Sequence, residues 1–115
     1  MKYDLLFDDG FWWAFDQDSR VFVHSFEVDD SIGIKSVDAQ KKAFCWAWYF
    51  GNDIRHIFNE DRNMETWKSP RVISVVDWDG IKHWMVVWEY SDGEIAKFKS
   101  FSTQEEAKRW LFEYT

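Results

Sequence analysis

The sequence predicts an α+β protein built from two βββα units, which form antiparallel sheets with helices packed on one face. Three observations support this class. Short β-branched and aromatic runs are separated by Asp-Gly turn signals, one of which recurs 70 residues later in the chain. Each half of the sequence then closes with a segment of helical character. The chain has 115 residues, the size of one ordinary domain, so we expect 1–115 to form a single compact domain.

The first unit covers about 1–51 and begins with three expected strands. These are Asp4–Asp8, then Phe11–Phe15 after an Asp9-Gly10 turn, then Arg20–Val28 after the turn DQDS. Phe11, Trp13 and Phe15 alternate to one side of the second strand and are predicted to be core. Trp12 points to the other side, where a helix could cover it or leave it open beside the acids.

A polar loop then leads to an expected helix from about Val37 to Phe50. Ser36 is a plausible N-cap and Gly51 a plausible stop signal. The letters FCWAWYF could also alternate as a strand, but the preceding letters DAQKKA are strong helix formers and favour a helix. In the connector, about 52–69, Ile54, Ile57 and Phe58 share one helical face. This pattern predicts a short second helix or a helical extension that packs on the first helix.

The second unit covers about 70–115 and begins after the single proline, Pro70. Its expected strands are Arg71–Trp78, Ile81–Tyr90 and Glu94–Phe101, joined by turns at Asp79-Gly80 and Asp92-Gly93. A terminal helix follows, with a capping box from Ser102 and Glu105 or from Thr103 and Glu106. Its apolar stripe consists of Ala107, Trp110, Leu111 and Tyr114.

The two units also share letters, which raises the possibility of an internal duplication. The helix pattern from Gln40 to Phe50 resembles the pattern from Gln104 to Tyr114, and the Asp-Gly turns align once a longer loop is allowed in the first copy. Generic turn and helix signals in two ordinary βββα segments would give the same match, so both explanations stay open.

Composition indicates a folded protein with an acidic first quarter. There are 9 Trp, 4 Tyr and 11 Phe, more aromatic rings than a small core readily hides, so some are expected near the surface. Residues 1–31 hold eight acids and two bases, whereas the other 84 residues hold 13 acids and 12 bases. This asymmetry opposes nucleic-acid binding and suits a positively charged partner, although it would also serve solubility alone. With Cys45 as the only cysteine and no long apolar run, we expect a soluble cytoplasmic protein.

Motifs for catalysis and for metal binding do not stand out. The three histidines and Cys45 lack metal-ligand spacing. Asp77, Asp79 and Glu94 hint at a metal-dependent nuclease, but the interval between Glu94 and Lys97 does not match the acid-x-Lys pattern and places the two on opposite sides of a strand. We therefore predict no catalytic residue, no metal and no cofactor.

We therefore favour the hypothesis that the chain is an acidic, non-enzymatic inhibitor that binds a protein with a basic surface. Carboxylates can replace phosphates in the cationic groove of a nucleic-acid-handling partner, and tryptophan beside them can anchor the contact. In size, acidity and lack of catalytic motifs, the chain resembles small phage counter-defence proteins of the anti-CRISPR or anti-restriction kind and toxin-immunity proteins. The alternatives are a small metal-dependent hydrolase or nuclease with dispersed ligands, and a scaffold dimer that uses the excess aromatics. The predicted partner-binding residues are Asp8, Asp9, Trp12, Asp16, Asp18, Asp29 and Asp30.

Overall fold

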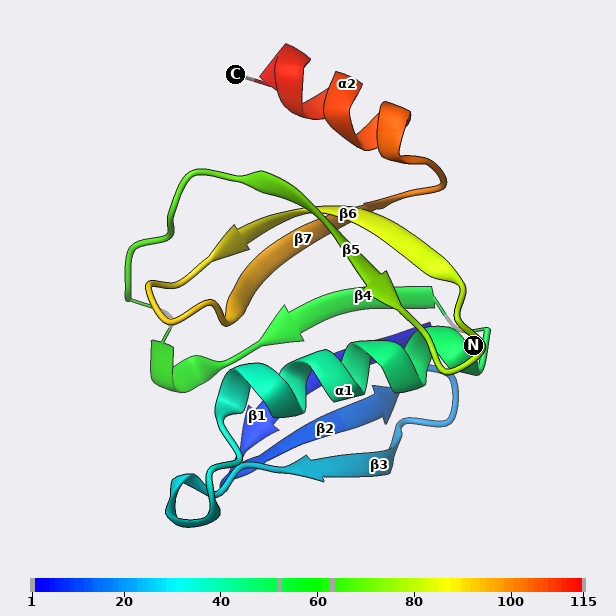
Figure 1. The fold of residues 1–115 in the computed structure, drawn as a ribbon. Coiled ribbons are helices and arrows are strands. Elements are labelled where there is room, and N and C mark those ends of the chain that lie inside the picture. The colour runs from blue at the N-terminus through cyan, green and yellow to red at the C-terminus, as the bar shows by residue number, and fades with distance from the viewer. Residues whose placement is uncertain (1, 52, 63, 115) are drawn as a thin grey trace.

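The computed structural model describes residues 2–51, 53–62 and 64–114 and confirms the α+β class (Figure 1). The described residues form seven strands, two α-helices and two short 3₁₀ turns, η1 and η2. In chain order they are β1 (Lys2–Asp8), β2 (Phe11–Asp16), β3 (Val21–Glu27), η1 (Asp30–Ile32), α1 (Ser36–Tyr49), β4 (Asp53–Phe58), η2 (Glu60–Arg62), β5 (Arg71–Val76), β6 (Lys82–Glu89), β7 (Ile95–Phe101) and α2 (Gln104–Tyr114).

The strands form two sheets. Sheet A has the order β3-β2-β1-β4, and its β1–β4 pair is parallel while the other pairs are antiparallel. Sheet C is the antiparallel meander β5-β6-β7. Each expected unit therefore contains three consecutive antiparallel strands followed by a helix. The duplication itself stays a prediction.

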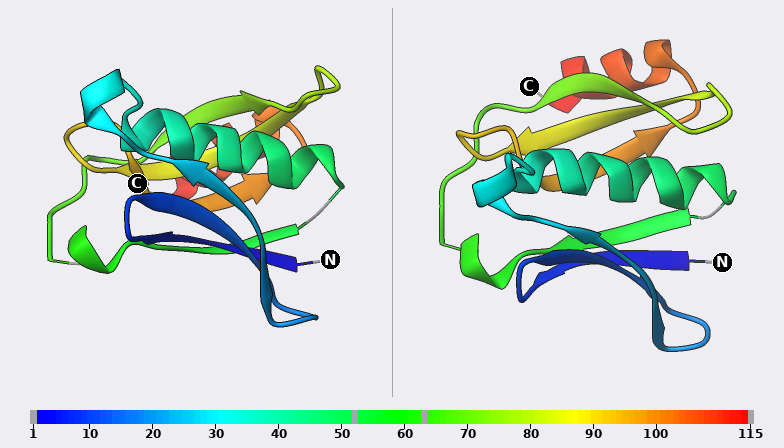
Figure 2. Two further views of the ribbon diagram at one scale, coloured as in Figure 1. Left: turned by 90° about the horizontal axis from the view of Figure 1, so that it is seen from below. Right: turned by 60° about the horizontal axis from the view of Figure 1, so that its bottom comes forward.

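Helix α1 lies between the two sheets (Figure 2). Its alanines Ala39, Ala43 and Ala47 are fully buried or nearly so, and their small side chains allow close approach. Trp46 packs towards sheet A through a ring contact with Tyr3, whereas Phe44 packs towards sheet C against Phe98. Helix α2 covers the far face of sheet C, where Ala107 and Trp110 pack with Val86 and Trp88. Neither helix is long and apolar enough to cross a membrane, within the residues that the structure describes.

The prediction of which side of β2 is core is wrong. Trp12 and Ala14 are fully buried under α1, and Trp12 Nε1 donates a hydrogen bond to Ser36 Oγ at 2.9 Å. Phe11, Trp13 and Phe15 are only partly buried, on the opposite face of the sheet. The predicted alternation along β2 is confirmed, but alternation alone does not specify which of two apolar faces a helix covers.

The predicted helix in the connector is also wrong, because Asp53–Phe58 forms strand β4 beside β1. The register skips one residue: Tyr3 pairs with Ile54, and Asp4 then pairs with His56. This bulge lets Ile54 and Ile57 both face the core at a spacing of three residues, which on paper resembles a helix. The connector also contains residues 52 and 63, which lie outside the described part of the chain.

The helix boundaries agree with expectation except at the first cap. Lys35 is the N-cap of α1 and makes no side-chain capping bond, so Ser36 is already the first helical residue. Gly51 follows the helix with φ of +71°, a conformation that suits glycine, and its N–H bonds the Trp48 carbonyl. At the start of α2, Thr103 Oγ1 accepts a hydrogen bond from the Glu106 N–H, as the capping box predicts.

Candidate partner-binding surface

The outer face of sheet A carries an apolar surface that neither helix covers. Both helices pack elsewhere: α1 on the inner face of this sheet and α2 on sheet C (Figure 1). Cross-strand pairing places the outward residues in rows, such as Phe58, Leu6 and Trp13 across three strands. We call this surface the aromatic face; it consists of Leu6, Phe11, Trp13, Phe15, Phe22 and Phe58.

The rings of the aromatic face contact one another but remain accessible. Phe22, on the edge strand β3, has its ring centroid 5.4 Å from that of Trp13 and 5.3 Å from that of Phe15. Phe22 and Phe58 are 55% and 45% exposed, which is high for such large apolar side chains. Trp13 is fixed by its Nε1, which donates to the Asp8 carbonyl at 3.2 Å. A contiguous, pre-oriented aromatic surface of this kind is typical of protein-binding sites.

Carboxylates border the aromatic face at both ends of its strands. In one row, Phe11 pairs on one side with Asp8 and on the other with Glu27. In the last row, Asp4 lies between Phe15 and His56, and His56 Nδ1 is 3.3 Å from Asp4 Oδ1. The Asp4 carboxylate is 14% exposed and also accepts from Gln17 Nε2 at 2.7 Å, so the exposed acidic border lies at the Asp8 end. An apolar centre with a charged border is the usual anatomy of a specific interface.

Acids from several loops converge at the end of sheet A that contains the β1–β2 turn. Asp9 and Gly10 form this turn with φ of +50° and +79°, and the Gly10 carbonyl accepts from the N–H of Val28, which leads into η1. Because β4 runs parallel to β1, η2 starts at the same end of the sheet. We call this region the acidic end; it contains Asp8, Asp9, Glu27, Asp29, Asp30, Glu60 and Asp61.

A buried polar network holds the loops of the acidic end together. Glu94, 1% exposed, accepts hydrogen bonds from Ser36 Oγ at 2.6 Å and from Asn59 Nδ2 at 2.6 Å. Arg62 from η2 reaches the same carboxylate at 3.2 Å and also bonds Asp92 at 2.9 Å. The hydrogen bond with Glu65, followed by the contacts with Asp92 and Glu94, raises the pKa of Arg62, so it stays charged. The network thus joins η2, the start of α1 and the β6–β7 turn.

Arg62 is already committed to this network, so it does not neutralise the acidic end. Its guanidinium binds Glu65, Asp92 and Glu94. Within the described residues, none of the seven acids that define the acidic end forms an ion pair. Their negative potential is therefore directed to solvent or to a partner.

Four of the seven predicted partner-binding residues lie together at the acidic end. Asp8, Asp9 and Asp30 are exposed there, and Asp29 is half-buried beside them. Asp29 also has a local role, because its carboxylate accepts from the Ser31 hydroxyl and N–H. These hydrogen bonds lower the pKa of Asp29 and keep it ionised.

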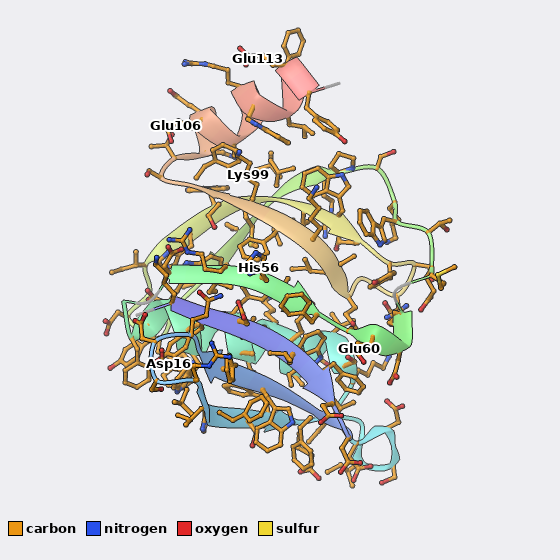
Figure 3. The ribbon with its side chains drawn as sticks, turned by 180° about the vertical axis from the view of Figure 1, so that it is seen from behind. Asp16, His56, Glu60, Lys99, Glu106 and Glu113 are labelled. Carbon is orange, nitrogen blue, oxygen red and sulfur yellow. The ribbon has the colours of Figure 1, made fainter. Side chains whose placement is uncertain are left out.

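The other three predicted residues lie elsewhere. Trp12 is in the core and cannot touch a partner. Asp16 is only 5% exposed on the inner face, where its Oδ1 accepts from the Asp18 N–H. Asp18 is exposed, but it belongs to the β2–β3 turn at the opposite end of the sheet (Figure 3, where Asp16 and Glu60 mark the two ends). The seven predicted residues therefore do not form one contiguous surface.

Sequence reasoning missed Trp13, Phe22 and Phe58 as surface residues. The alternation of β2 places Trp13 on the face opposite Trp12, and Trp13 is recognised as a surface residue once that face is assigned to the outside of the sheet. Phe22 is exposed because β3 lies at the edge of sheet A, and Phe58 joins the aromatic face because β4 pairs with β1. Both facts depend on contacts between distant parts of the chain, which local sequence patterns do not specify.

Comparison of the chain with family models, with curated proteins and with solved structures finds no match. The surface must therefore be interpreted from its own chemistry. Within residues 2–51, 53–62 and 64–114, no three His, Cys, Asp or Glu side chains are grouped to hold a metal ion. The acids considered for a nuclease are also separated, since Asp79 precedes β6 and Glu94 follows it, at opposite ends of an eight-residue strand.

Proposed function

We propose that this protein is a non-enzymatic inhibitor that binds a basic, nucleic-acid-handling protein through the aromatic face and the acidic end. The observation that carries the proposal is the uncovered outer face of sheet A, with large rings at its centre and carboxylates around it. The rings would supply affinity by desolvation, and the acids would steer a cationic partner and compete with phosphate for its groove. Counter-defence and toxin-immunity proteins are examples of such inhibitors.

The acidic border favours a foreign partner over a second copy of the chain. A two-fold pairing that joins the two acidic ends would bring Asp8 and Glu27 against like charges. A partner with arginine or lysine around an apolar centre would complement this border. The chain itself shows such contacts elsewhere, with Lys97 over Trp88 and Lys99 over Trp110. None of the cation–π pairs among the described residues lies on the aromatic face.

Site-specific photo-crosslinking tests the proposal directly. A benzoylphenylalanine at position 13 should crosslink to one protein in a lysate of the native host. The matched control carries the same group at Glu113 on α2, far from sheet A (Figure 3), and should not capture that protein. Equal capture from both positions would contradict a specific surface.

The captured protein then allows the two parts of the surface to be separated by kinetics. Trp13→Ala should cost about 2 kcal/mol of binding free energy, mainly through faster dissociation. The combined reversal Asp8→Lys, Asp9→Lys and Asp30→Lys should slow association about tenfold or more at low salt, and this difference should shrink as salt rises. The reversals Glu105→Lys and Glu113→Lys on α2 serve as the charge control. An association rate that the first set leaves unchanged would sink the role of the acidic end.

A further inference from the structure

A second surface, unrelated to the aromatic face, lies between α1 and β5. It is an open groove of about 470 Å³. One wall is a single stripe of the helix, formed by Val37, Gln40, Lys41 and Phe44. The other wall is the consecutive run Arg71–Val75 of strand β5, and Glu89, Gly93 and Ile95 complete the lining.

The second wall shows that the groove follows the edge of the strand. Side chains of consecutive strand residues point to opposite faces, so a groove on one face would touch only alternate residues. This groove touches all five, and β5 is an edge strand whose only partner among the described strands is β6. The groove therefore follows the backbone of β5 over about 17 Å, the length of five extended residues. It also reaches Glu89 of β6 and Ile95 of β7 on the face of sheet C.

The backbone groups that face the groove follow from the hairpin. The Asp77 N–H donates to the Ile81 carbonyl at 3.0 Å, so the backbone polar groups of Asp77 face β6. In an antiparallel ladder, the N–H and C=O groups of alternate residues face opposite sides of the strand. The backbone N–H and C=O of Val76 therefore face the free edge of β5. In agreement with this, the Val76 carbonyl accepts a hydrogen bond from Cys45 Sγ on α1 at 3.1 Å. By the same alternation, the N–H and C=O groups of Val72 and Ser74 face the groove.

The groove closes at one end, and its walls indicate what would fit beside these groups. Cys45 caps the Val76 carbonyl, which leaves Val72 and Ser74 as the open pairing positions. Gln40 is committed to β7, because its amide exchanges two hydrogen bonds with the Ile95 backbone at 2.8 and 2.7 Å. Val37 is apolar and half-buried, whereas Phe44 is fully buried beneath the groove. An inserted chain would place an apolar side chain against Val37.

Lys41 supplies the charge preference. It is exposed at the groove and forms no ion pair within the described residues, whereas Arg71 is engaged with Glu89. In a chain of net charge −7, this leaves a locally cationic site. Such a site would attract a carboxylate on the inserted segment.

We propose that this groove binds an extended segment of a partner polypeptide, which adds to β5 as a fourth strand of sheet C and places an acidic side chain beside Lys41. Strand addition supplies affinity through backbone hydrogen bonds and specificity through alternate side chains. Strand β3, at one edge of sheet A, has Val21 and Phe22 exposed but is not part of this groove. Binding at this groove is independent of the aromatic face, so it is expected even if the aromatic face binds no partner.

The probe is a displayed library of random octapeptides selected against the full-length protein. Enriched peptides should alternate apolar residues with polar ones and carry Asp or Glu. In ¹⁵N spectra of the wild-type protein, a selected peptide should shift the amide signals of Val72 and Ser74 most strongly. Failure to enrich any common pattern, or shifts centred on β3, would overturn the proposal.

Two pairs of variants then test the geometry. Ser74→Pro removes a groove-facing N–H that the ladder does not use, which an edge strand tolerates, and should weaken peptide binding at least tenfold. Ser74→Ala keeps the N–H and should bind normally. Lys41→Glu should weaken the binding of acidic peptides about tenfold. Lys42→Glu, on the same helix but outside the groove, should leave their binding unchanged.

The same variants decide the remaining outcomes. Circular dichroism shows whether Ser74→Pro still folds. If it does not, the test rests on the comparison of Lys41→Glu with Lys42→Glu and on the amide shifts. Peptides that bind Ser74→Pro and wild type equally would refute strand addition. A homodimer in light scattering that Ser74→Pro abolishes would replace the partner segment with a second copy of this chain and overturn the proposal.

Discussion

Asp77 illustrates how one carboxylate can hold a turn together. It accepts hydrogen bonds from His83 Nε2 at 2.8 Å and from the N–H groups of Asp79 and Ile81. The His83 ring in turn stacks on Trp48 of α1, with centroids 4.8 Å apart. The hydrogen bond from His83, with smaller contributions from the backbone N–H groups, lowers the pKa of Asp77. The β5–β6 turn is thereby attached to the end of α1.

This lowered pKa sets the sign of a pH prediction. Because the carboxylate binds protons less readily when folded than when unfolded, its stabilising effect is complete above the ordinary aspartate pKa of about 4 and is lost as pH falls through the lower folded value. The melting temperature should therefore decline below about pH 4. Asp77→Asn should melt lower than wild type at pH 7 and decline less steeply in acid. Parallel curves for the two proteins between pH 2.5 and 6 would contradict this role.

Single residues also show what the sequence cannot reveal. The alternation around Trp12 and Trp13 was plain in the letters, yet both sides of β2 are rich in rings. Burial of Trp12 depends on α1 crossing that side of the sheet, with Ser36 placed to accept its indole N–H. This is a tertiary fact, because the helix begins some twenty residues later and no local pattern specifies where it docks.

Among the secondary elements, η2 has the largest structural role for its size. It is three residues long, but its Arg62 connects Glu65, Asp92 and the buried Glu94. The guanidinium also lies over the Tyr90 ring, 4.2 Å from the centroid. Removing it would leave Glu94 buried without a cation.

Arg62→Ala should therefore destabilise the fold by about 3 kcal/mol, the usual cost of removing one partner of a buried pair. Arg55→Ala provides the matched control, because Arg55 pairs with Asp53 at 3.0 Å on the exposed surface of β4 and should cost about 0.5 kcal/mol or less. Urea unfolding of both variants measures the difference. Similar midpoints would show that the network adds little stability.

Elements with local signals were predictable, and elements that depend on distant pairing were not. Both helices, the three Asp-Gly hairpin turns and the meander of 71–101 follow from caps, turns and alternation. Strand β4 was mistaken for a helix because its bulge restores a three-residue spacing, and only its pairing with β1 reveals the strand. The acidic end was anticipated at the β1–β2 and β3–α1 loops, but η2 joins it through that same unforeseen pairing.

For the molecule as a whole, the balance between rings and charges governs self-association. The aromatic face should promote pairing of two copies, while the carboxylates around it should oppose pairing at low salt, where charges act over about 30 Å. We expect a monomer at 10 mM salt and a rising average mass towards 1 M, where screening shortens that range to about 3 Å. Phe22→Ser should remain monomeric throughout. Light scattering measures this, and a dimer that is equally populated at both salt concentrations would favour the scaffold alternative.

The position of α1 between two sheets has a consequence for how the chain acquires its structure during synthesis. Residues 1–51 contain a complete βββα unit, but one side of α1 has no covering until 71–101 emerge, and β1 lacks its second neighbour until β4 is made. The nascent first unit therefore exposes Phe44 and Trp48 on the ribosome, so folding must wait for the second half of the chain. If the two units descend from one ancestor, that ancestor could have buried the same helix only against another copy of itself.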